Sequence, residues 1–201
     1  MINSKIHPRR IAREGVLQAL YAQQFSDDEP AIVLNRIMAL YPEKKKNLDP
    51  LVFDKLVDKD VFLNDVLEKK LPNCDAIFHM GACSSTTETN ESFLNENNYE
   101  YTRHLASFCL EKGVRFIYAS SAATYGAGEN GYYDNESKLK LLQPLNLYGD
   151  SKHKFDLWAQ AQGALKKIVG LKYFNVYGPN EYHKQEMQSM VRKGFLQVRD
   201  T

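Results

Sequence analysis

Two residues four positions apart, Tyr148 and Lys152, have side chains and a spacing suited to acid–base chemistry. They begin a stretch of helical pattern, where a spacing of four places both side chains on one face. A nearby ammonium favours phenolate over phenol and lowers a tyrosine pKa from about 10 towards neutral pH. The spacing is also typical of a solvated surface pair. As a functional pair, it would supply a general base that removes a hydroxyl proton.

The sequence YASSAATYG, at positions 118–126, gives this pair a context. It has the pattern of a strand that runs into small hydroxyl residues at its carboxyl end, where open parallel sheets bind ligands. There Ser121 could hydrogen-bond the same substrate oxygen as Tyr148. We therefore predict that Ser121, Tyr148 and Lys152 act together in catalysis.

The elements that would position these residues alternate along the chain. Apolar runs typical of strands buried on both faces occupy residues 76–80, 116–119 and 168–174. Amphipathic stretches of helical length cover about 59–70, 91–112 and 147–162, and Gly113 is the expected C-cap of the second. This alternation predicts an α/β fold with a parallel sheet covered by helices.

Residues 8–41 follow a different pattern, that of two amphipathic helices with no preceding strand. Residues 26–28 and Pro30 have the types that begin a second helix, and Pro42 ends it. We predict an all-helical N-terminal extension over residues 1–42, followed by an α/β body over residues 43–201.

Composition excludes several classes of protein. The 201 residues, 43% of them hydrophobic, allow one globular domain or slightly more, and a formal charge of +1 argues against a dedicated polyanion binder. No apolar run approaches the roughly 18 residues of a membrane span, and no signal-peptide core is recognisable. Three cysteines without a CxxC spacing argue against a disulfide framework or a metal site and favour the reducing cytoplasm.

Four motifs in combination resemble the ADP-L-glycero-D-manno-heptose 6-epimerase family of the extended short-chain dehydrogenase/reductases. They are HMGACSSTTE from His79, YASSAATYG from Tyr118, PLNLY ending at Tyr148, and YFNVYGP from Tyr173 with His183 and Lys184 beyond it. The resemblance covers residues 43–201 and implies a Rossmann-like fold with NADP, or NAD in its place. It also implies inversion of a sugar carbon of an ADP-heptose by transient oxidation and reduction, for lipopolysaccharide core biosynthesis.

The resemblance implies a role for each matching residue. Tyr148 and Lys184 correspond to two acid/base residues on opposite sides of the sugar, Lys152 to a contact of the nicotinamide ribose, and Ser121 and Asn175 to substrate-binding residues. The residues that correspond to cofactor contacts are Lys44, Lys59, Met80, Gly81, Ala82, Cys83, Ser84, Asn97, Lys152 and Val176. Members of the family form homopentamers, so a homo-oligomer is expected, with no membrane partner.

Sugar-nucleotide 4,6-dehydratases resemble this family but carry Thr-Asp-Glu where this chain has Ser121, Ala122 and Ala123. Elimination of water needs that acidic pair, and two alanines cannot supply it. The sequence therefore argues against a dehydratase.

The expected cofactor-binding start of the fold is missing from the sequence. Residues 1–42 contain one glycine, Gly15, and so lack the glycine-rich turn that meets a pyrophosphate at a helix N-terminus. The family's substrate domain continues past the position of Thr201. We therefore interpret residues 43–201 as a partial NAD(P)-binding domain without its first βαβ element and C-terminal substrate domain, and we expect weak or no activity.

Residues 7–42 resemble transcription antitermination factor NusB through the sequence PRRIAREGVLQALY from Pro8. This resemblance implies RNA binding. A basic cluster that could contact phosphates precedes the first acidic residue and comprises Lys5, Arg9, Arg10 and Arg13. The same charges also suit an ordinary helix start. Three interpretations remain: an epimerase fragment, which we favour, an RNA-binding antitermination protein, and a noncatalytic chimera that is a real fusion or an assembly artefact.

Overall fold

The computed structural model describes residues 55, 57–178, 181 and 188–199, which divide into two compact units. The larger unit is Lys59–Phe174. The smaller one takes in the described residues before Lys59 and from Asn175 onward. The two helices predicted within residues 8–41 lie outside the described residues.

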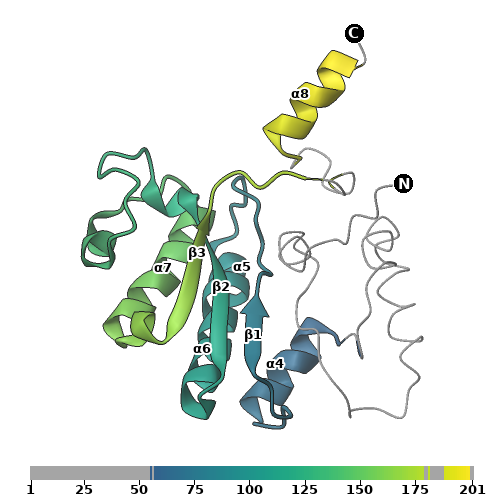
Figure 1. The fold of residues 1–201 in the computed structure, drawn as a ribbon, viewed down its shortest axis with the longest axis vertical. Coiled ribbons are helices and arrows are strands. Elements are labelled where there is room, and N and C mark those ends of the chain that lie inside the picture. The colour runs from purple at the N-terminus through teal and green to yellow at the C-terminus, as the bar shows by residue number, and fades with distance from the viewer. Residues whose placement is uncertain (1–54, 56, 179–180, 182–187, 200–201) are drawn as a thin grey trace, which may run out of the picture. The chain divides into compact units, whose positions relative to one another are not determined.

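Three parallel strands form the sheet of the larger unit in the order β1-β2-β3 (Figure 1). They are β1 (Ala76–His79), β2 (Arg115–Ser121) and β3 (Ile168–Tyr173). Phe116 of β2 pairs with Ile77 on one side and with Ile168 on the other. All three carboxyl ends therefore meet at one edge of the sheet, and the prediction of an α/β fold with a parallel sheet is confirmed.

Helices connect successive strands and pack on one face of the sheet. Helix α4 (Lys59–Leu67) precedes β1, and α5 (Glu91–Leu94), a π-helical segment (Asn95–Glu100) and α6 (Tyr101–Lys112) lead to β2. Two 3-10 segments (Ala122–Tyr125 and Glu136–Leu141), α7 (Leu147–Ala161) and a third 3-10 segment (Ala164–Lys166) lead to β3. Figure 1 shows α5, α6 and α7 behind the strands, as right-handed crossovers between neighbouring parallel strands require.

The core lies between the sheet and these helices. Phe116, Leu105 and Phe155 are almost completely buried there. Tyr118 packs edge-on against Phe155, with ring centroids 4.7 Å apart. Gly113 ends α6 with a φ of 71°, as its predicted C-cap role requires. Each large apolar side chain in this layer stabilises the fold by roughly 1.5–3 kcal/mol, which is why the helices stay on this face.

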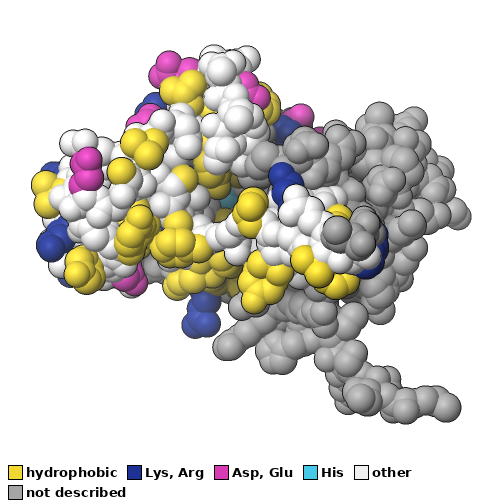
Figure 2. All heavy atoms as spheres, turned by 90° about the horizontal axis from the view of Figure 1, so that it is seen from above, with side chains coloured by type: hydrophobic (Ala, Val, Ile, Leu, Met, Phe, Trp, Pro, Cys, Tyr) yellow, Lys and Arg dark blue, Asp and Glu magenta, His cyan; other side chains and the backbone are white. Residues whose placement is uncertain are grey.

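The opposite face of the sheet is more exposed than the strand patterns predict. Phe78 of β1 is 56% exposed, and Val169 of β3, in the same register, is 47% exposed. Between them, Ile117 of the central strand is buried. The prediction of burial on both faces is wrong for β1 and β3, because the described helices of this unit pack on the other face. From above, hydrophobic side chains gather along the lower side of the described surface (Figure 2).

The smaller unit contains helix α8 (Met190–Arg199). Ahead of this helix, the Glu181 carboxylate accepts hydrogen bonds from the backbone N–H groups of Gly178 (2.8 Å) and Ser189 (2.7 Å) and from the Ser189 hydroxyl (2.9 Å). No helix in the described part of the chain is both long and apolar enough to cross a membrane.

Candidate functional site

The predicted partners Ser121 and Tyr148 meet at the carboxyl edge of the sheet. Ser121 ends β2 and Tyr148 lies in the first turn of α7, and the Ser121 side chain is close enough to Tyr148 to favour its phenolate. The Asn146 side chain fixes the start of α7, because it accepts a hydrogen bond from the N–H of Gly149 at 2.8 Å. The structure therefore brings together the hydroxyl pair that the sequence predicts.

Lys152 lies one turn further along α7 and is 4% exposed. Its Nζ donates a hydrogen bond to the carbonyl of Ala119 on β2 at 2.8 Å. Burial lowers the Lys152 pKa to about 8, against the opposing charge of Asp156. This bond ties α7 to the strand that carries Ser121.

The pKa of Tyr148 differs from the sequence expectation. Burial raises the Tyr148 pKa above its ordinary value, and the nearby Ser121 side chain opposes that rise only in part. The predicted lowering by Lys152 is therefore wrong for this state, because that ammonium bonds the Ala119 carbonyl. Tyr148 carries its proton at neutral pH, so it can act as a proton donor.

The 80–84 loop, predicted to contact the cofactor, follows β1 at this edge and is tied to α7 by Asn98. The Asn98 amide accepts from the backbone N–H of Cys83 (2.9 Å) and donates to the Cys83 carbonyl (3.0 Å) and to Ser151 Oγ (3.0 Å). Ser151 Oγ in turn donates to the carbonyl of Tyr148 at 2.7 Å. Asn98 thus fixes the position of the 80–84 loop relative to the turn of α7 that carries Tyr148.

Sequence reasoning missed Asn98 as a positioning residue. It is fully buried and lies in the π-helical segment, and such segments are frequent at functional sites. The available signal was an asparagine in the middle of a long helical pattern, where polar side chains are usually solvated. The partners of Asn98, Cys83 and Ser151, lie in two other segments of the chain. The residue pattern around Asn98 therefore does not reveal them.

His79 ends β1 beside this network and is neutral. Its Nε2 lies 2.9 Å from Thr102 Oγ1, which itself donates to the carbonyl of Asn98 at 2.6 Å. Because the threonine proton is used there, His79 Nε2 is the donor of its bond. Burial, and secondarily the charge of Lys152, lower the His79 pKa to about 3. His79 therefore adds no charge at neutral pH.

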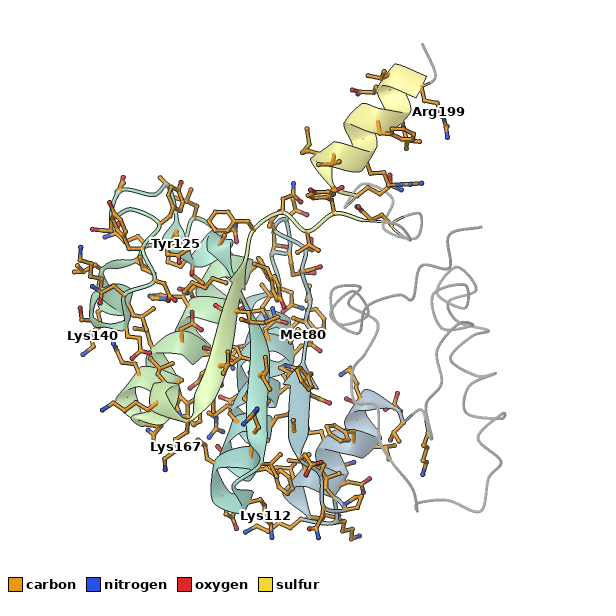
Figure 3. The ribbon with its side chains drawn as sticks, in the orientation of Figure 1. Met80, Lys112, Tyr125, Lys140, Lys167 and Arg199 are labelled. Carbon is orange, nitrogen blue, oxygen red and sulfur yellow. The ribbon has the colours of Figure 1, made fainter. Side chains whose placement is uncertain are left out.

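The other predicted cofactor and substrate residues have different surroundings. Lys59 begins α4 and pairs with Asp60 at 2.8 Å, and Asn97 donates to Asn98 Oδ1 at 3.1 Å. Figure 3 labels Met80 just beyond β1, where its sulfur lies 3.8 Å from the Tyr173 hydroxyl. The predicted residues Asn175 and Val176 belong to the smaller unit, and Lys44 and Lys184 lie outside the described residues.

Gly149→Ala is expected to loosen the contact between α7 and the turn after Ser121. A Cβ at position 149 would lie 2.9 Å from the Ala123 carbonyl oxygen and 3.1 Å from Pro144 Cβ. We expect a loss of about 1–3 kcal/mol in the free energy of unfolding, measured by urea denaturation. Gly194→Ala on α8, where a Cβ meets nothing within 4 Å, is the matched control. Equal stability of the two variants would contradict the steric argument.

Comparison with known protein families identifies a match over most of the chain. A model of the NAD dependent epimerase/dehydratase family matches residues 21–200. The "ADP-L-glycero-D-manno-heptose-6-epimerase" of Nitratidesulfovibrio vulgaris (strain DP4) is 52% identical over 157 residues, which cover 78% of this chain and 49% of that protein. The protein of the same name from Fusobacterium nucleatum subsp. nucleatum is 47% identical over 173 residues, covering 76% and 52%.

Solved structures agree with these matches. The crystal structure of Helicobacter pylori ADP-L-glycero-D-manno-heptose-6-epimerase aligns with a TM-score of 0.63 and 34% identity, over 74% of this chain and 46% of that one. The chain spans about half the length of the curated relatives it matches. The resemblance of residues 7–42 to NusB is not shown by these comparisons, and the family match already begins at residue 21.

Proposed function

The chain belongs to the NAD dependent epimerase/dehydratase family, and from this premise we propose that it is part of an ADP-glycero-manno-heptose 6-epimerase. The relatives of that name support the substrate class, an ADP-linked heptose. The observation that carries the proposal is the placement of the Ser121 and Tyr148 side chains together beside the buried Lys152. These three groups lie where a parallel sheet binds its ligands.

The residues at this edge fit a nicotinamide dinucleotide, NADP or NAD. An ammonium has three N–H donors, and one of those on Lys152 bonds Ala119 within the described part of the chain, which leaves donors for ribose hydroxyls. The small residues Gly81 and Ala82 allow a nucleotide to approach the loop backbone. When bound, the dinucleotide would supply the hydride acceptor and donor that inversion of the sugar carbon needs. Lys44, Lys59, Met80, Cys83, Ser84, Asn97 and Val176 are the further proposed contacts.

Side chains of this protein transfer the substrate proton. Tyr148, whose raised pKa keeps it a phenol at neutral pH, donates its proton to the substrate oxygen when the alcohol forms, and as phenolate it takes the proton back. Ser121 orients the same oxygen through its hydroxyl. Lys184 is the proposed acid/base residue for the opposite orientation of the sugar, and Asn175 a proposed substrate ligand. Inversion at one carbon requires an acid/base residue on each side of the sugar.

Cofactor binding by the full chain is the direct test. We expect purified protein to retain, or to bind in calorimetric titration, one NADP per chain, and to interconvert the two ADP-heptose epimers slowly. Lys152→Met serves as the binding-deficient comparison. Binding of neither NADP nor NAD, together with no epimer conversion, would overturn the proposal and favour a noncatalytic chimera.

RNA binding is a second candidate function that depends on the basic cluster Lys5, Arg9, Arg10 and Arg13. Salt-dependent binding of a short RNA is expected to weaken when Arg9, Arg10 and Arg13 are replaced by alanine, because fewer phosphates are neutralised. Unchanged binding would dismiss this function. A homo-oligomer, a cytoplasmic location and the domain boundary near residue 43 stay predictions.

A further inference from the structure

A second group of buried polar side chains lies one helical turn beyond Lys152 and takes no part in the proposed chemistry. At its centre is Asp156 of α7, which is 2% exposed. Its carboxylate accepts hydrogen bonds from Tyr118 Oη (2.8 Å), Ser120 Oγ (2.8 Å) and Lys172 Nζ (2.5 Å). Since Tyr118 and Ser120 belong to β2 and Lys172 to β3, one side chain connects α7 to two strands.

Lys172 extends this connection to the turn that follows Ser121. Its Nζ donates to Thr124 Oγ1 at 2.7 Å, and Thr124 Oγ1 donates to the carbonyl of Ser121 at 2.7 Å. Thr124 is completely buried. The Lys172 ammonium also lies 5.4 Å from the centre of the Tyr125 ring, at the end of the same turn. A chain of hydrogen bonds therefore runs from Asp156 to the backbone of Ser121.

Three polar residues of α7 contact successive residues of β2. Ser121 meets Tyr148, the Ala119 carbonyl meets Lys152, and Ser120 meets Asp156. Tyr148, Lys152 and Asp156 are spaced by four residues and so share one face of the helix. Fixing Asp156 therefore fixes both the rotation of α7 and its position along the strand.

We infer that Asp156 and Lys172 are a positioning pair that holds the side chains of Ser121 and Tyr148 next to each other. The inference rests on the proposed function for what that contact does. A buried ion pair is a weak source of net stability, because the cost of desolvating two charges offsets their attraction. The hydrogen bonds that the pair makes with β2, β3 and the turn after Ser121 are directional. They therefore hold these elements and α7 in a single relative geometry.

The pair also lines a cavity of about 510 Å³, which Tyr133 and Leu139 border as well. Water entering this cavity can solvate the Asp156 carboxylate when Lys172 is removed. A Lys172→Met variant should therefore fold with a moderate loss of stability. Lys172→Arg keeps the charge and the donors and is the conservative comparison.

The test measures the NMR chemical shift of the Tyr148 ¹³Cζ nucleus in the full chain, prepared with ¹³C-labelled tyrosine. The Tyr148 signal is identified by its disappearance in the Tyr148→Phe variant. We expect Lys172→Met to move this signal and Lys172→Arg to return it to the wild-type position. The control is Leu105→Ala, a buried α6 substitution that lowers the melting temperature without touching the pair. It should leave the Tyr148 signal in place.

The double variant Asp156→Leu with Lys172→Met removes both charges and gives a second folded sample, in which the signal should also move. An unmoved Tyr148 signal in either folded variant would overturn the inference, and so would unfolding of both, which would assign the pair to folding alone. The measurement needs neither cofactor nor sugar. Failure of the wild-type chain to bind NADP would therefore count against the proposed function and leave this result standing.

Discussion

Replacement of Lys152 by methionine is expected to stabilise the fold near neutral pH and to weaken NADP binding. Lys152 is 4% exposed, and burial lowers its pKa from 10.5 to about 8. A shift of this size corresponds to a cost on the order of 3 kcal/mol for folding with the ammonium charged. Methionine has a similar length and shape and no charge to desolvate, so the variant avoids this cost.

The dependence on pH identifies the cause. The unfolded chain keeps the ordinary lysine pKa of 10.5, so between pH 8 and 10.5 it binds more protons than the folded chain does. Wild-type stability should therefore rise with pH across this window, and the penalty is complete below pH 8. Urea denaturation should give Lys152→Met an advantage of roughly 3 kcal/mol at pH 7 that shrinks towards zero above pH 10.

Lys154→Met is the matched control, because it removes a lysine from the same helix at an exposed position. Lys154 bonds Asn95 and lies 4.6 Å from the centre of the Tyr99 ring. Its replacement should change the free energy of unfolding by less than about 1 kcal/mol and leave NADP binding intact. An equal gain in both variants would show that burial of the Lys152 charge is not the cause.

The sequence predicts the alternation of strands and helices because apolar runs and amphipathic stretches have distinct periods. It also predicts the meeting of Ser121 with Tyr148, since the end of a strand and the start of the next helix lie at the same sheet edge. Asn98, Asp156 and Lys172 are different. Each acts through partners on other elements, up to 53 positions away for the bond from Asn98 to Ser151, and no local pattern encodes such contacts.

Burial is the property that the sequence conveys least well. The four-residue spacing suggests that Lys152 lowers the Tyr148 pKa, whereas the buried phenol has a raised one. Apolar strands likewise suggest burial on both faces, whereas Phe78 and Val169 are about half exposed. In both cases the local residue types are as expected, but solvent access depends on which segments pack around them.

Tyr148→Phe is expected to lower the rate of ADP-heptose epimer conversion by roughly 10²–10⁴-fold, the usual loss when a general acid–base group is removed. The phenylalanine ring keeps the packing of tyrosine, and only the hydroxyl is lost. Loss of the polar interaction with Ser121 should cost no more than about 1 kcal/mol of stability. Conversion of one epimer to the other is measured chromatographically over long incubations with saturating NADP.

The control Tyr99→Phe removes a hydroxyl from a tyrosine whose ring packs under Lys154, outside the proposed site, and should keep the wild-type rate. NADP affinity, measured by titration, should be the same in Tyr148→Phe as in the wild-type chain, because Tyr148 is not among the proposed cofactor contacts. A lower rate at equal affinity assigns Tyr148 to proton transfer rather than to binding. If Tyr148→Phe converts the sugar as fast as the wild-type chain, another group moves the proton, and the geometry at Ser121 serves a different purpose.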